Sequence, residues 1–86
     1  MYKIFYSTQA QKDAKKANRS ELKDKIQSLL EIIKEDPFKY PPSYEPLLAE
    51  AAGTFSRRIN SQHRLVYQVY EKEKIVKVIR MWTHYE

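Results

Sequence analysis

The chain has 86 residues and a formal net charge of +5 at pH 7, so it is long enough for one modest core and favours an anionic partner such as nucleic acid, an acidic peptide or a membrane surface. Its lack of cysteine excludes disulfides, thiolate metal ligands and a cysteine nucleophile, and its two histidines are a weak basis for a metal site. Since no apolar run approaches the ~18 residues of a spanning helix and the N-terminus lacks the apolar stretch of a secretory signal, we expect a single cytoplasmic domain over residues 1–86.

The first predicted elements are a strand and a helix. The run YKIFY at residues 2–6 is rich in β-forming side chains, and Ser7 and Thr8 behind it are good N-cap types. We therefore expect a helix that begins near Gln9 and ends at Asn18 in a left-handed cap. Its narrow face of small side chains can approach a sheet or another helix closely and consists of Ala10, Ala14 and Ala17.

A second helix has the clearest pattern in the chain. Ser20 is a good N-cap, and Glu21 suits the positive end of the helix dipole in the first turn. The helix should stop at Asp36, because Pro37 disfavours helical geometry in the residue before it. One continuous apolar stripe runs along the helix and is made of Leu22, Ile26, Leu29, Leu30 and Ile33.

All four prolines lie between Asp36 and Pro46, in the stretch DPFKYPPSYEP. Because proline fixes its own backbone and restricts the residue before it, this stretch should be a stiff, extended connection that can keep a side chain in place. The following residues 47–52, LLAEAA, suggest a short turn of helix, and Gly53, the only glycine, marks the start of a hairpin.

Three strands are expected in the rest of the chain, at residues 54–60, 63–70 and 75–83. Strands joined by tight turns pair antiparallel, and the helices must then cover one face of the sheet and leave the other face largely open. The predicted fold is therefore of the α+β class, with the order β-α-α-β-β-β and two helices packed on one face of an antiparallel sheet.

The hairpin at residues 54–70 is rich in basic side chains. With Asn60–Gln62 as its loop, Arg58 faces Arg64 across the ladder on the open face, while Arg57 points to the other face. Directly opposed like charges destabilise a pair of strands, and such local conflicts are often found at functional sites. Two interpretations stay open: the arginines extend into water or pair with a carboxylate, or they form a cradle for phosphate, whose oxygens match the guanidinium fork. The carboxylates in question are Glu45, Glu50 and Glu71.

Two further residues fit phosphate chemistry. His84 follows the last strand and is suited to general-acid catalysis near neutral pH, and Glu45 precedes Pro46, which keeps its backbone extended. Taken singly, each is more often an ordinary surface residue. Together with Arg58 and Arg64 they supply what RNA cleavage needs: a base for the 2′-hydroxyl, cations for the charge that builds on the phosphate, and an acid for the departing 5′-oxygen. This route requires no metal and no cofactor.

Three motifs together resemble one protein family. They are YEPL at residues 44–47, GTFSRRINSQHRLVYQV at residues 53–69, and the His84–Tyr85 pair near the C-terminus. In these motifs the chain is similar to the YoeB-type (Txe) toxins of the RelE/ParE superfamily of bacterial toxin–antitoxin systems. The resemblance implies the microbial-ribonuclease fold and a ribosome-dependent endoribonuclease that cuts messenger RNA in the ribosomal A site. It further implies a cognate antitoxin with an acidic C-terminal segment and contact with the 70S ribosome. The toxin–antitoxin complex is expected to bind operator DNA, and no membrane partner is expected. The resemblance leaves open whether the toxin forms a homodimer.

The resemblance also assigns roles to single residues. Glu45 corresponds to the general base of the family, His84 to its general acid, and Arg64 to the arginine that stabilises the transition-state phosphate. Arg58 corresponds to a second phosphate-binding arginine, and Tyr85 to the residue that helps place the substrate, where its ring can stack on a base. By contrast, His63 is expected to serve the hairpin itself.

Some residues depart from the family pattern. Leu48 stands where these toxins usually have a lysine, which removes one cation from the expected site, and Glu86 adds a negative charge after the His84–Tyr85 pair. Two other functions remain to be separated from the nuclease. A gyrase-poisoning toxin of the ParE type shares the fold without the acid and the base, and a basic nucleic-acid-binding module needs the arginines but neither Glu45 nor His84.

Overall fold

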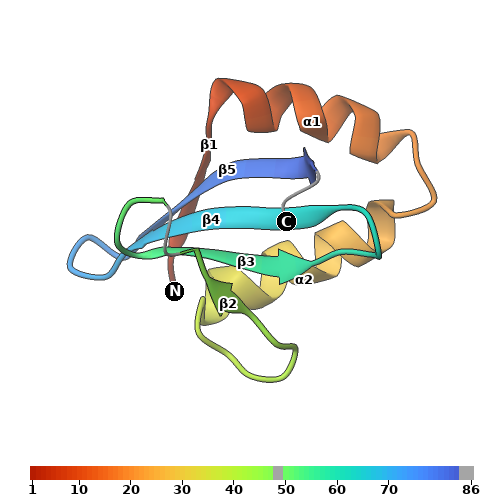
Figure 1. The fold of residues 1–86 in the computed structure, drawn as a ribbon. Coiled ribbons are helices and arrows are strands. Elements are labelled where there is room, and N and C mark those ends of the chain that lie inside the picture. Colours follow the sequence, from red (N-terminus) through yellow and green to blue (C-terminus); the bar gives the residue numbers. More distant parts are fainter. Residues whose placement is uncertain (48–49, 84–86) are drawn as a thin grey trace.

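The computed structural model describes residues 1–47 and 50–83 and confirms the α+β class and the order of the main elements (Figure 1). The sheet has five strands in the order β1-β5-β4-β3-β2, in which β1 runs parallel to β5 and the other neighbours are antiparallel. The predicted order lacks β2, because two residues beside a proline have no recognisable strand pattern. The elements are β1 (Lys3–Tyr6), α1 (Thr8–Asn18), α2 (Lys23–Glu35), β2 (Glu45–Pro46), β3 (Thr54–Arg58), β4 (Arg64–Tyr70) and β5 (Ile75–Thr83).

The start of α1 is capped as expected. The hydroxyl of Ser7 accepts a hydrogen bond from the Ala10 N–H at 3.0 Å and donates one to the Ile79 carbonyl at 2.7 Å. The first contact satisfies an N–H group that has no partner within the helix, and the second ties the start of α1 to β5. One serine thus positions the helix on the sheet.

The left-handed cap expected at Asn18 is wrong. The chain leaves α1 through Arg19, which has right-handed geometry with φ −94° and ψ 0°. A tight turn satisfies the last carbonyls instead: the Arg19 N–H donates to the Lys16 carbonyl at 3.2 Å, and the Ser20 hydroxyl donates to the Ala17 carbonyl at 2.8 Å. With these acceptors occupied, the chain does not need a left-handed residue.

The second helix begins later than expected and ends where expected. Ser20 accepts a hydrogen bond from the Leu22 N–H at 3.1 Å, so it caps the turn before α2, and the helix itself starts at Lys23. Its end at Asp36, with φ −154° and ψ 104°, agrees with the restriction that Pro37 imposes on the residue before it. The turn expected at residues 47–52 includes residues 48–49, which lie outside the described part of the chain.

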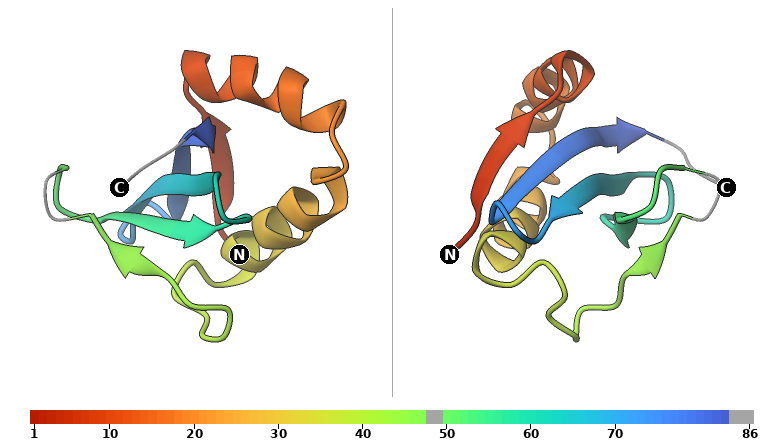
Figure 2. Two further views of the ribbon diagram at one scale, coloured as in Figure 1. Left: turned by 45° about the vertical axis from the view of Figure 1, so that its right-hand side comes forward. Right: turned by 90° about the vertical axis from the view of Figure 1, so that its left-hand side faces the viewer.

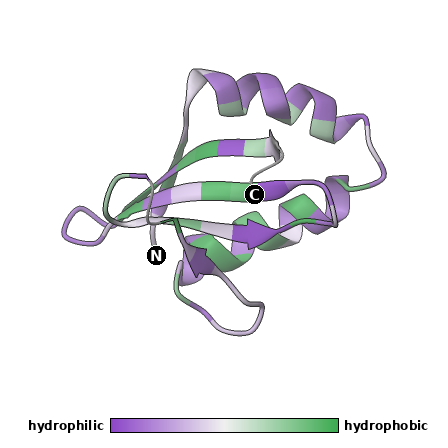
Figure 3. Cartoon of the chain, in the orientation of Figure 1, coloured by the Kyte–Doolittle hydropathy of each residue, from purple (hydrophilic) through white to green (hydrophobic). Residues whose placement is uncertain are grey.

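Both helices lie on the same side of the sheet (Figure 2). Side chains from both helices belong to the hydrophobic core. Hydrophobic residues lie along the middle of β4 and β5 and along α2, whereas much of α1 is hydrophilic (Figure 3). Within the described residues, no helix has the length and apolarity needed to cross a membrane. The buried hydrophobic cluster consists of Tyr2, Ala10, Ala17, Ile26, Leu29, Ile33, Ile59, Leu65, Tyr67, Val76, Val78 and Met81.

The hairpin has the expected register but shorter strands. Arg58 pairs with Arg64, and the Ile59 N–H donates to the His63 carbonyl at 2.9 Å. At the tip, the side-chain oxygen of Asn60 accepts hydrogen bonds from the Gln62 N–H at 2.9 Å and the His63 N–H at 2.7 Å. This turn bends the chain away from the ladder, so β3 ends at Arg58 and β4 begins at Arg64.

Candidate functional site

The open face of the sheet carries three of the expected site residues. Glu45 of β2 pairs with Ser56 of β3, and Arg58 of β3 pairs with Arg64 of β4. Directly paired residues project from the same face, as do residues two apart in one strand, so these four side chains share a face. The neighbouring Leu65 is buried in the core on the opposite face, so the shared face is the one turned away from the helices.

Arg64 is the central cation of this group. Its Nη1 atom lies 3.7 Å from Glu45 Oε2 and donates a hydrogen bond to Ser56 Oγ at 3.4 Å. The Arg64 side chain is 21% exposed and that of Glu45 is 71% exposed, so the guanidinium lies against the sheet while the carboxylate reaches into solvent. An ion pair of this length and exposure orients the two groups but contributes little stability.

The opposition of Arg58 and Arg64 is confirmed, and Arg58 is exposed. The contact between Arg64 and Glu45 offsets part of the repulsion, so the two interpretations of the arginines are not exclusive: one arginine contacts a carboxylate while the face stays accessible to phosphate. In the part of the chain that the structure describes, neither arginine forms an ion pair with Glu50 or Glu71.

The expected residues His84 and Tyr85 lie outside the described residues, as do Leu48 and Glu86. The last described residue of β5, Thr83, pairs with Arg64 across the ladder. Because Thr83 directly precedes His84 in the sequence, the described backbone leads to the site, but the roles expected for His84 and Tyr85 stay predictions.

His63 belongs to the tip of the hairpin, as expected. Its ring stacks on the ring of Trp82, with centroids 3.9 Å apart and an angle of 17° between the planes. Since Trp82 lies near the end of β5, this stack joins the β3–β4 turn to the part of β5 that approaches Arg64.

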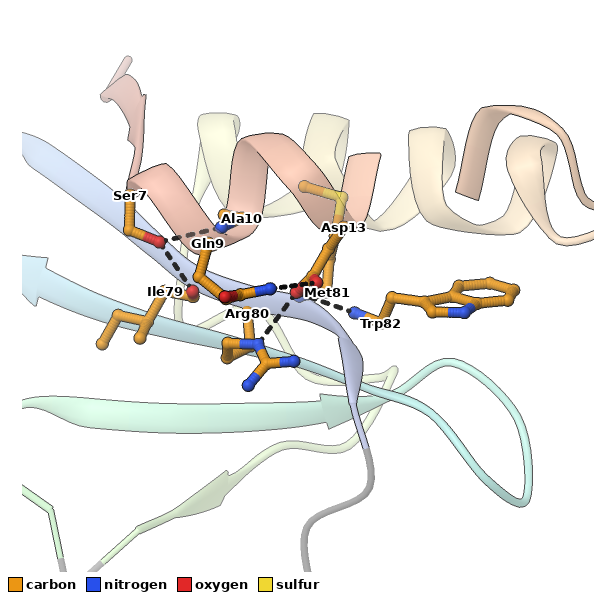
Figure 4. Close-up of polar contacts among 8 residues, drawn as sticks. All are labelled: Ser7, Gln9, Ala10, Asp13, Ile79, Arg80, Met81 and Trp82. Atoms are coloured by element: carbon orange, nitrogen blue, oxygen red, sulfur yellow. Dashed lines mark hydrogen bonds and ion pairs between the residues drawn. The ribbon is translucent and has the colours of Figure 1, made fainter. Parts of the chain in front are cut away.

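A second polar cluster, built around Asp13 of α1, is not predicted from the sequence (Figure 4). The Asp13 side chain is buried and accepts hydrogen bonds from Arg80 Nε at 2.9 Å, Gln9 Nε2 at 3.1 Å, and the backbone N–H groups of Met81 at 3.1 Å and Trp82 at 3.4 Å. The ladder between β4 and β5 is irregular here, which leaves these N–H groups available to a side chain. A signal was present in the sequence, because Asp13 lies on the same face of α1 as the small residues Ala10 and Ala17.

The groups around Asp13 favour its ionised form. Burial raises the pKa of the carboxyl, but hydrogen bonds from Arg80, Gln9 and the Met81 N–H, together with the charge of Arg80, outweigh burial and lower the pKa below its ordinary value. Asp13 is therefore a carboxylate at neutral pH, and its partners all donate to it.

The open face carries groups of the kinds that can transfer protons and bind phosphate. It combines a carboxylate, a hydroxyl and two guanidinium groups. Among residues 1–47 and 50–83, no group of three or more potential ligand side chains is arranged to bind a metal ion.

The fold and this face define a class of protein: a small basic α+β protein that presents arginines and a carboxylate on an uncovered sheet. Residues 5–85 match the profile of the YoeB-like toxins of bacterial type II toxin–antitoxin systems, and the chain belongs to this family. The family expected from the sequence motifs is thereby confirmed.

Individual relatives agree with this assignment. A Toxin YoeB from Synechocystis sp. is 39% identical over 69 residues, which cover 80% of this chain and 78% of the relative. The solved structure of a YoeB/ParE toxin from Agrobacterium tumefaciens is 32% identical, with a TM-score of 0.85 over 96% of this chain and 99% of that one. A YoeB–YefM complex from Staphylococcus aureus contains a chain that is 32% identical, with a TM-score of 0.80 and coverage of 99% of both chains.

Proposed function

We propose that this toxin is an endoribonuclease that inhibits translation by cutting messenger RNA in the A site of the ribosome. The observation that carries the proposal is the Glu45 carboxylate, 3.7 Å from the Arg64 guanidinium on a sheet face that also carries Arg58. A base beside two cations on an accessible face suits a polyanionic substrate whose reaction builds negative charge on phosphate.

In the proposed reaction, Glu45 removes the proton of a 2′-hydroxyl, and the oxygen attacks the adjacent phosphorus. Arg64 and Arg58 stabilise the additional negative charge on the phosphate oxygens, since the guanidinium group stays charged and matches their geometry. The bond to the 5′-oxygen breaks, and His84 donates a proton to this leaving group. The products are a 2′,3′-cyclic phosphate and a free 5′-hydroxyl, and the protons balance without a metal.

The exposure of the site supports a requirement for the ribosome. The Glu45 side chain is 71% exposed, so water competes for its charge in the free protein. Enclosure between messenger RNA and the ribosome would exclude this water and strengthen every electrostatic interaction in the site. Free RNA provides no such enclosure, and we expect it to be a poor substrate.

The same face is the proposed contact of the antitoxin. A YoeB toxin from Staphylococcus aureus is known in complex with YefM, and for this chain we propose a cognate antitoxin whose acidic segment covers Arg58 and Arg64. A disordered acidic segment that folds onto a basic face neutralises the cations and blocks the substrate at once.

Primer extension on translating ribosomes tests the proposal. Addition of the purified toxin should produce new 5′ ends in the messenger RNA at A-site codons, and the Arg64→Gln variant should produce none above background. Translation that stops while the messenger RNA stays intact would instead favour a binding module or a poison of another target such as gyrase.

A further inference from the structure

The fourth basic residue of the hairpin, Arg57, is an interior residue. It is 1% exposed and is among the largest fully buried side chains of the described residues. Within the described part of the chain, no carboxylate forms an ion pair with Arg57. Burying a guanidinium without a carboxylate is costly unless its donors are satisfied, so the position of Arg57 requires an explanation.

The donors of Arg57 are directed at the proline-rich segment before β2. The Tyr67 hydroxyl accepts a hydrogen bond from Arg57 Nε. It donates its own proton to the Pro37 carbonyl at 2.8 Å. Burial raises the pKa of this hydroxyl, although the charge and hydrogen bond of Arg57 act in the opposite direction, so it remains a donor at neutral pH. The acceptors of Arg57 are Tyr67 Oη (from Nε, 3.1 Å), the Pro42 carbonyl (from Nη1, 2.6 Å), and the Pro37 and Lys39 carbonyls (from Nη2, 3.1 and 2.9 Å).

The guanidinium also contacts the residue next to Glu45. Its central carbon lies 4.9 Å from the centroid of the Tyr44 ring, at cation–π distance. The Tyr44 ring packs in addition against Phe55, with centroids 5.7 Å apart. Arg57 is thus bound to the chain from Pro37 to Tyr44, directly before the proposed base.

The strand that carries Glu45 is too short to fix its own position. It has two residues, and the second, Pro46, has no N–H to donate to the ladder. After the strand, the Leu47 N–H donates to the Thr54 carbonyl at 2.9 Å. Before the strand, the contacts of Arg57 with the Pro42 carbonyl and the Tyr44 ring supply the other anchor.

We infer that Arg57 is a positioning residue for Glu45: by binding the carbonyls of residues 37–42 and the Tyr44 ring, it fixes β2 so that the Glu45 carboxylate faces Arg64. The inference rests on the proposed function in so far as Glu45 acts as the base. Arginine is required because its planar fork reaches several carbonyls at once, whereas lysine has a single nitrogen.

A double-mutant cycle separates positioning from general damage. Arg57→Lys keeps the charge but leaves carbonyls without donors. We expect it to lower kcat for ribosome-bound messenger RNA by about 10- to 100-fold, because a small displacement of the Glu45 carboxylate would misalign the proposed base with its substrate. In the Glu45→Gln background, where the base is already absent, the same change should have little further effect. Equal losses in both backgrounds would overturn the inference.

Two matched variants exclude a loss of stability as the cause. Ile33→Val shortens a buried side chain of α2 away from β2, and it should destabilise the protein while leaving kcat unchanged. If Arg57→Lys fails to fold, Tyr67→Phe removes only the hydroxyl that links Arg57 to Pro37, and it should lower kcat to a smaller extent and likewise only when Glu45 is present. Full activity of the Tyr67→Phe and Arg57→Lys proteins would contradict a positioning role.

A measurement without RNA distinguishes failure of this inference from failure of the proposed function. Glu45 and Ser56 are paired across β2 and β3, so the free protein should show nuclear Overhauser contacts between their backbones. These contacts should weaken in Arg57→Lys and persist in Ile33→Val. Full cleavage by Glu45→Gln would refute the proposed base, whereas unchanged Glu45–Ser56 contacts in Arg57→Lys would refute the positioning.

Discussion

Replacing Asp13 by alanine should be among the most damaging single changes outside the sheet. The carboxylate is buried and accepts hydrogen bonds from Arg80, from Gln9 and from the Met81 and Trp82 N–H groups. The Met81 N–H would be left in the interior without an acceptor, at a cost of about 1–3 kcal/mol. The Arg80 side chain is 31% exposed and can turn to water, so its lost pair adds roughly 1 kcal/mol at most.

The expected total for Asp13→Ala is therefore about 1–4 kcal/mol in the free energy of unfolding. For 86 residues the whole stability should be only about 4–13 kcal/mol, so the variant should lose a large share of it. Urea unfolding measures the effect, with midpoint and slope read separately so that a change in the denatured state is not taken for a change in stability. Glu31→Gln, on the exposed side of α2, is the control. A loss below roughly 0.5 kcal/mol for Asp13→Ala would refute the reasoning and mean that water replaces the carboxylate.

The pH dependence of stability follows from the same carboxyl. The pKa of Asp13 is lower in the folded protein than its ordinary value, because the donors around it outweigh burial. Between the folded and unfolded pKa values the unfolded chain binds more protons, so stability rises with pH there. The contribution of Asp13 is complete above its unfolded pKa of about 3.9 and disappears as pH falls through the lower folded value. The stability difference between wild type and Asp13→Asn should shrink over that acidic range, and a constant difference would contradict it.

Other predictions concern the open face. Glu45→Gln and His84→Gln should each lower cleavage of ribosome-bound messenger RNA by about 10²- to 10⁴-fold in single-turnover assays. Near wild-type rates for both variants would mean that the open face binds RNA but does not catalyse proton transfer. Arg64→Met should abolish cleavage and change the free energy of unfolding by less than about 1 kcal/mol. The variant loses both the repulsion between Arg64 and Arg58 and the contact between Arg64 and exposed Glu45, and these two effects oppose each other. A larger loss of stability in urea unfolding would mean that the ion pair between Arg64 and Glu45 is stronger than expected. Affinity for an acidic antitoxin peptide should fall steeply between low and high salt, and a salt-independent affinity would point to an apolar contact elsewhere.

Local patterns were enough to predict much of the fold and part of the site. The stripe along α2 and its end before Pro37 depend on residues within a few positions of one another, and the structure agrees with both. The hairpin register depends on a three-residue loop and on side-chain alternation, and it correctly places Arg58 opposite Arg64. Side-chain alternation also assigns Arg57 to the opposite face, but it does not predict which groups Arg57 contacts there.

Interactions between distant segments were decided only by the tertiary structure. Asp13 and the Met81 N–H are separated by 68 positions, and their contact depends on how α1 crosses an irregular part of β5. The strand β2 exists because its two residues meet β3, and Arg57 reaches carbonyls 15 to 20 positions away. Periodicity and capping act within a turn of helix or a strand pair, so the sequence by itself determined the elements and the basic face. Packing of remote segments decided where Glu45 lies relative to Arg64, since a side chain finds such partners only once the layers are assembled.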